Sequence, residues 1–130
     1  MSLYVADTHS LVWYFTGSEK LGQKALQVFR DSILGEVIII IPTIVLAEVI
    51  DIAEKKRISI DYEELIDKIE ENSSFEIYPL DINVLRMLKD VPNIYELHDK
   101  IIVATAKLLD AKVITKDVDI QNSKLVETIW

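Results

Sequence analysis

The chain has 130 residues, half of them hydrophobic, and a formal net charge of −8. This length suits one domain over residues 1–130 with a sizeable core, and the composition excludes a disordered chain. With no cysteine, the chain cannot form disulfides, thiolate zinc sites or a catalytic thiol. The N-terminus lacks a signal-peptide pattern, and the longest apolar run, residues 37–47, is too short to span a membrane. We therefore expect a soluble, cytoplasmic protein.

Short strands that alternate with helices predict the fold class. Residues 37–41 are an uninterrupted β-branched run, typical of a strand covered on both faces. Residues 97–109 are apolar almost all round, which predicts a buried helix. We expect an α/β fold with a mostly parallel four- to five-stranded sheet and helices on both faces. The predicted strands are residues 3–6, 37–41, 75–78, 112–115 and 125–130, and the predicted helices are 9–15, 22–34, 44–56, 61–72, 81–88 and 97–109.

Polar residues mark the predicted helix ends. We expect Thr8 to cap the helix over residues 9–15 and Thr43 to cap the helix that follows the second strand. Asp61 is predicted to begin the next helix, as the first residue of a capping box. Gly17 is predicted to end the first helix, because glycine adopts the left-handed conformation found there.

Four acidic residues lie where a parallel sheet would bring them together. Asp7 directly follows the first strand, and Asp117 lies two residues beyond Thr115, the end of the fourth. Glu48 lies in the helix after the second strand, and Asp99 begins the helix that leads into the fourth. Because the carboxyl ends of parallel strands share one edge, we expect these four side chains on one rim.

Four neighbouring carboxylates repel one another, so without a cation one or more should keep a proton. Mg²⁺ or Mn²⁺ prefers oxygen ligands and would remove this conflict. Two such ions can activate water and stabilise the leaving oxygen in phosphodiester cleavage. Bound cations would also reverse the local charge, whereas the acidic net charge alone argues against nucleic-acid binding. Taken singly, each acid has a simpler interpretation as a helix cap, a solvated residue or a turn residue.

Three stretches resemble the motifs of the PIN-domain family: VADTHSLVWYF at 5–15, PTIVLAEV at 42–49 and LHDKIIVATAKLLDAKVITKD at 97–117. The resemblance covers nearly the whole chain, with the motifs in order at ordinary spacing. It implies a Mg²⁺- or Mn²⁺-dependent endoribonuclease of the kind found as the toxin, VapC, in toxin–antitoxin pairs. It also implies an RNA substrate, a small antitoxin partner and a homodimer.

The resemblance assigns the catalytic and metal-binding acids to Asp7, Glu48, Asp99 and Asp117, supported by the hydroxyl residues Thr8 and Thr115. Glu96 stands where some members carry a further acid. The family pattern there is Asp-Pro, whereas this chain has Glu-Leu, which puts its metal role in doubt. Asp119 could replace or assist Asp117.

Other interpretations stay open at this point. The chain could be a housekeeping RNA-processing nuclease, or a non-catalytic module on the same fold that binds RNA or protein. Lys100 and Lys116 could contact phosphate or serve only solubility. The aromatic residues could stack on bases, pack in the core or form a protein interface, and these are Trp13, Tyr14, Phe15 and Trp130. The helix over residues 9–15 carries more large apolar residues than one buried stripe requires, which predicts an interface for an inhibitor.

Overall fold

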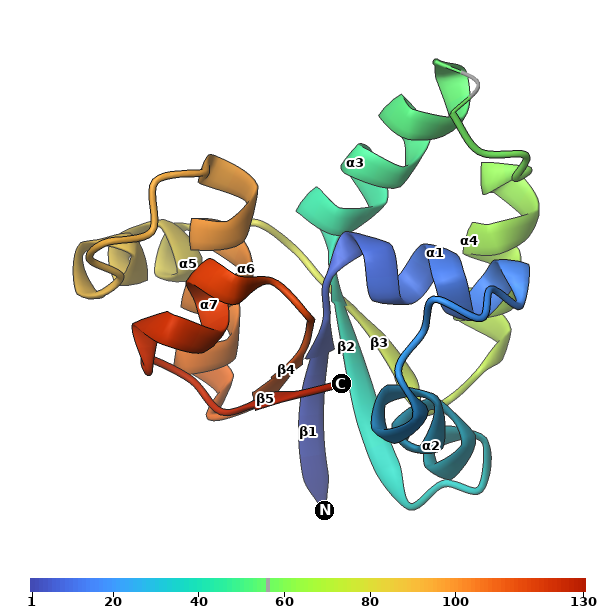
Figure 1. Cartoon of the computed structure of the whole chain (residues 1–130), viewed down its shortest axis with the longest axis horizontal. Helices are drawn as coiled ribbons and strands as arrows, with labels where there is room; N and C mark the ends of the chain where they lie inside the picture. The colour runs from blue at the N-terminus through green and yellow to red at the C-terminus, as the bar shows by residue number, and fades with distance from the viewer. Residues whose placement is uncertain (56) are drawn as a thin grey trace.

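The computed structural model describes residues 1–55 and 57–130. Within these ranges the chain forms one five-stranded sheet, with strand order β3-β2-β1-β4-β5 and every pair parallel (Figure 1). This confirms the predicted α/β fold. The elements are β1 (Ser2–Ala6), α1 (Thr8–Thr16), α2 (Gln23–Ile33), β2 (Val37–Pro42), α3 (Thr43–Glu54), α4 (Tyr62–Glu71), β3 (Phe75–Tyr78), α5 (Ile82–Met87), the 3-10 turn η1 (Leu88–Asp90), α6 (Leu97–Leu109), β4 (Lys112–Ile114), α7 (Val118–Ser123) and β5 (Thr128–Ile129).

The central strand β1 separates two groups of helices (Figure 1). Val5 on β1 pairs with Ile40 on β2 and with Val113 on β4, and all three are buried. One hydrophobic core lies under α1, α2 and α4, and a second joins α5, α6 and α7. Helix α3 packs against both α1 and α6, so it connects the two groups above the carboxyl ends of the strands.

The aromatic residues of α1 are less exposed than the sequence predicts. Tyr14 stacks on Phe29 of α2 with 4.2 Å between ring centroids, and Phe15 meets Phe75 of β3 edge-on at 6.1 Å. Trp13, Tyr14 and Phe15 nevertheless stay partly exposed, so the interface expected on this helix stays a prediction. Its side chains find partners on α2 and β3, which the local pattern of residues 9–15 cannot reveal.

Two predicted helix caps are also wrong. Asp7, not Thr8, caps α1, because its carboxylate accepts a hydrogen bond from the Ser10 amide at 2.8 Å. Thr43 is the first residue of α3, and its hydroxyl instead accepts a hydrogen bond from the Leu80 amide at 3.1 Å.

Near the C-terminus the structure contains a short helix, α7, that the sequence does not predict, and β5 is shorter than expected. Elsewhere, Gly17 ends α1 at a φ of 66° and Asp61 caps α4, as predicted. The end predicted at Lys56 for the helix after β2 lies outside the described residues. Over residues 1–55 and 57–130, no helix is long and apolar enough to cross a membrane.

Candidate active site

A cleft of about 550 Å³ opens at the carboxyl edge of the sheet. Its acidic side chains come from four places in the chain: the end of β1, helix α3, the start of α6 and the segment after β4. The structure thus brings together the four acids that the topology argument predicted, with Glu96 as a fifth. The acids that line the cleft are Asp7, Glu48, Glu96, Asp99 and Asp117.

Asp7 lies at the base of the cleft and is almost fully buried. Its backbone amide donates to the Ile114 carbonyl at 3.3 Å, which joins the end of β1 to β4. Burial raises the pKa of the Asp7 carboxyl, while the Thr115 hydroxyl and the amide and hydroxyl of Ser10 act in the opposite direction. This carboxylate is therefore held in place by the fold but ionises less readily than an exposed one.

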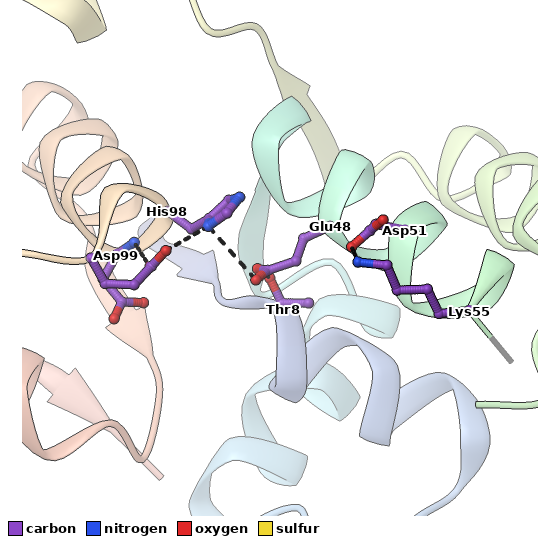
Figure 2. A network of polar contacts seen from close by, with 7 residues as sticks. Thr8, Glu48, Asp51, Lys55, His98 and Asp99 are labelled. Atoms are coloured by element: carbon purple, nitrogen blue, oxygen red, sulfur yellow. Dashed lines mark hydrogen bonds and ion pairs between the residues drawn. The ribbon is translucent and has the colours of Figure 1, made fainter. Parts of the chain in front are cut away.

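Glu48 is oriented by contacts with two other elements. The buried Thr8 hydroxyl, at the start of α1, donates a hydrogen bond to Oε1 of Glu48. His98 of α6 lies on its other side, with Nδ1 3.9 Å from Oε2 of Glu48 and 2.6 Å from Oε1 of Glu96. Figure 2 shows His98 between the Glu48 side chain and the first turn of α6.

These contacts shift the pKa values of His98 and Glu96. The hydrogen bond to Glu96 raises the pKa of His98 against the effect of burial, and the negative charge of Glu48 raises it further. Burial works to raise the pKa of Glu96, but hydrogen bonds from His98 and from the Asp99 amide outweigh it and lower the pKa. His98 therefore lies between Glu48 of α3 and Glu96, the residue before α6, and both acids favour its protonated form.

The Asp99 carboxyl is partly buried and faces the other acids of the cleft. Partial burial, followed by the charges of Asp117, Glu96, Asp7 and Glu48, raises the pKa of its carboxyl from 3.8 to about 7. Its own backbone amide donates to Oε2 of Glu96 at 2.8 Å, which makes Glu96 the cap of α6. Among the described residues no hydrogen-bond partner compensates the Asp99 carboxylate, so it carries the electrostatic conflict that the sequence predicted for this rim.

Asp117 and Asp119 occupy different positions. Asp117 caps α7 by accepting from the Ile120 amide at 2.9 Å, and its own amide donates to the Thr115 hydroxyl at 3.0 Å. Thr115 is buried and so fixes the turn that leads to Asp117. Asp119 is exposed in the first turn of α7, outside the lining of the cleft.

The donor set of the cleft suits a hard divalent cation, because carboxylate oxygens are the ligands that Mg²⁺ and Mn²⁺ prefer. The raised pKa of Asp99 also identifies a conflict that a cation would remove. Over the described part of the chain, no three histidine, aspartate or glutamate side chains lie close enough together to hold one ion. Asp7, Glu48 and Asp117 each use one carboxylate oxygen to accept a hydrogen bond from within the protein.

Two features of the site escaped sequence reasoning. Glu96 acts as the helix cap, although glutamate is a rare cap, and the link from His98 to Glu48 joins residues far apart in the chain. The sequence did contain a signal for the Glu96 cap, because Glu96 lies three residues before Asp99, just before a predicted apolar helix. The second had no sequence signal.

The fold and the cleft define an α/β domain with an acidic site at the carboxyl edge of a parallel sheet. The family model of the PIN domain matches residues 4–124. The chain therefore belongs to the PIN-domain family, whose members are generally nucleases that use divalent metal ions.

Solved structures support the same fold. The chain is similar to VapBC2 from Rickettsia felis bound to a promoter DNA fragment, at 18% identity and a TM-score of 0.71, over 98% of this chain and 97% of that one. DNA-bound VapBC from Salmonella typhimurium is similar at 17% identity and a TM-score of 0.71, over 99% and 98%. A toxin–antitoxin complex from Klebsiella pneumoniae is similar at 22% identity and a TM-score of 0.67, over 100% and 97%. A comparison with curated proteins found no match.

Proposed function

We propose that this protein is a Mg²⁺- or Mn²⁺-dependent endoribonuclease and the toxin of a toxin–antitoxin pair. One observation carries the proposal: carboxylates from β1, α3, α6 and the segment after β4 line one cleft. Membership of the PIN-domain family adds that such a site is generally a nuclease site. The similar solved structures, whose descriptions name VapBC or a toxin–antitoxin complex, support the toxin role.

In this proposal Asp7, Glu48, Asp99 and Asp117 hold the metal, with Glu96 close by. When bound, the metal would supply activated water and stabilise charge on the phosphodiester oxygens. The chain's own contribution is positional. The Thr8 hydroxyl orients Glu48, and Thr115 fixes the turn before Asp117.

The proposal predicts that metal binding and RNA cleavage depend on the same carboxylates. We expect Mn²⁺ to raise the melting temperature of the wild type, because it binds only the folded state. Asp99→Asn should weaken this response and reduce cleavage of single-stranded RNA by about a hundred-fold or more. Asp119→Asn is the matched control, because it removes the same charge from a residue outside the cleft lining.

Two results would count against this function. The first is RNA cleavage that persists in Asp99→Asn with chelator present. The second is a Mn²⁺-induced rise in melting temperature that is equal in the wild type, Asp99→Asn and Asp119→Asn. Loss of both responses only in Asp99→Asn would support the metal site and the nuclease together.

The proposed partner is a small antitoxin that carries a basic residue into the cleft. Arginine suits this role, because its guanidinium can bind a carboxylate at two points. Co-expression with the adjacent small reading frame should give a complex that no longer cuts RNA. If that product neither copurifies nor changes activity, the toxin role is wrong and a housekeeping nuclease is left.

The proposed homodimer has a candidate surface around α5. Ile82 and Leu85 on this helix are 59% and 44% exposed, and Leu80 just before it is 39% exposed. Apolar residues grouped in this way often mark a protein interface. Sedimentation velocity should show a dimer that Ile82→Glu converts to a monomer, whereas an unchanged dimer would place the interface elsewhere.

A further inference from the structure

The acidic cleft has a second wall with different chemistry. His9 and Trp13 of α1 and Lys116, from the segment between β4 and α7, line it beside the acids. Lys116 is the only lysine or arginine among the described residues that line this cleft. Within a chain of net charge −8, it therefore places one positive charge directly beside the carboxylates.

Trp13 holds this charge in position. The Lys116 ammonium lies 4.7 Å from the centroid of the Trp13 ring, and Lys20 approaches the same ring at 5.8 Å. An ammonium over an indole ring gains about 0.5–1 kcal/mol at an exposed site. Although Asp117 is the chain neighbour of Lys116, no carboxylate among the described residues makes a direct ion pair with this ammonium.

Packing in turn limits how far Trp13 can move. Trp130 meets it edge-on, with ring centroids 5.7 Å apart and an interplanar angle of 68°, and the His9 ring lies 5.3 Å away. Trp130 itself packs so tightly on Gly22 that a Cβ there would lie 2.5 Å from its carbonyl carbon and 2.6 Å from Cδ1. The contacts from Gly22 through Trp130 therefore support the Trp13 ring on which the Lys116 ammonium lies.

We infer that Lys116 binds a phosphate of the RNA strand in the cleft and that Trp13 is its positioning residue. This inference rests on the proposed function, and it names the group that receives the substrate. An unpaired ammonium at the wall of an acidic cleft offsets the repulsion between the carboxylates and a phosphate. Because the indole ring restricts the lysine before RNA arrives, less side-chain freedom is lost on binding.

The test measures RNA binding separately from cleavage. Fluorescence anisotropy of a labelled single-stranded RNA is followed at several salt concentrations in an Asp99→Asn background, and cleavage kinetics are measured without that substitution. Lys116→Met should weaken binding on the order of ten-fold, as expected for loss of a charge-assisted hydrogen bond. The slope of log affinity against log salt should fall by about 0.7, the value for one phosphate on a single strand. In cleavage, KM should rise while kcat changes little.

Lys20→Met is the matched control. Lys20 also lies over the Trp13 ring, but it does not line the cleft. It should leave the affinity and the slope nearly unchanged. Trp13→Leu should weaken binding by less than Lys116→Met does, and Trp13→Phe should restore part of the loss. The double variant Trp13→Leu, Lys116→Met should bind no worse than Lys116→Met alone, because Trp13 acts through the lysine.

The outcomes separate this inference from the proposed function. Equal effects of Lys116→Met and Lys20→Met, or additive effects of the Trp13 and Lys116 substitutions, would overturn the inference while leaving the nuclease intact. Binding that depends on Lys116 in a protein that never cuts RNA would support the inference and remove the nuclease. If the protein binds no RNA, both are wrong.

Discussion

Asp99→Asn should stabilise the metal-free protein at alkaline pH while it weakens the response to metal. In the folded protein the pKa of this carboxyl is about 7, whereas its ordinary value is 3.8. The folded state therefore keeps a proton that the unfolded chain releases near pH 4. A group whose pKa is raised by folding lowers the free energy of unfolding as pH increases from its unfolded to its folded pKa, so the loss is complete above about pH 7. Asparagine has almost the same shape and no charge, so the variant avoids this loss.

The magnitude follows from the shift and from the exposure of the side chain. Asp99 is only partly buried, so solvent and salt screen much of the repulsion from the other acids. After this discount we expect the variant to be more stable than the wild type by about 1–2 kcal/mol at pH 8. For a chain of this size, each kcal/mol corresponds to roughly 4 °C in melting temperature.

Urea and thermal unfolding in chelator at pH 5.5 and pH 8 measure this effect, with Asp119→Asn as the control of equal charge change. The gain in unfolding free energy from Asp99→Asn should be smaller at pH 5.5 than at pH 8. With Mn²⁺ present, the wild type should become the more stable protein. A variant that is no more stable than the wild type at pH 8, or an equal gain from Asp119→Asn, would refute the electrostatic reasoning.

Two further substitutions test the supports of the site. Gly22→Ala should destabilise the protein by about 1–3 kcal/mol, because its Cβ would overlap Trp130, and the tryptophan fluorescence should change; a neutral variant with an unchanged spectrum would contradict this packing. Thr8→Val keeps the shape but removes the hydroxyl that donates to Glu48, so Mn²⁺ affinity measured by calorimetry should fall by about ten-fold or more. An affinity equal to that of the wild type would mean that Thr8 does not orient Glu48.

The parts of the fold that the sequence predicted well have strong, long-range patterns. Helix α6 has the predicted bounds, because an apolar stretch of this length is too long for an ordinary strand, and its residues 101–106 are buried. The acids at the carboxyl edge were predictable because a parallel sheet directs all its strand ends the same way. Helix α7 was missed because it has six residues, of which only Ile120 is buried, so it has almost no periodic signal.

Two further features could not be predicted from the sequence. Asp7 and Thr8 are adjacent and both suit a helix cap, so the sequence cannot decide between them, and only the Ser10 hydrogen bond does. The sequence also could not predict that Lys116 lies over Trp13, because the two residues come together only when β1 and β4 pair.

Three acids of the cleft have a second task, since Asp7, Glu96 and Asp117 each cap a helix. A descendant that lost nuclease activity would still need a side chain at these positions that accepts a hydrogen bond. Retention of Asp, Asn, Ser or Thr there would therefore say little about whether such a protein is active. Glu48 and Asp99 cap no helix among those described. Their replacement in a related protein would therefore be a better sign that catalysis has been lost.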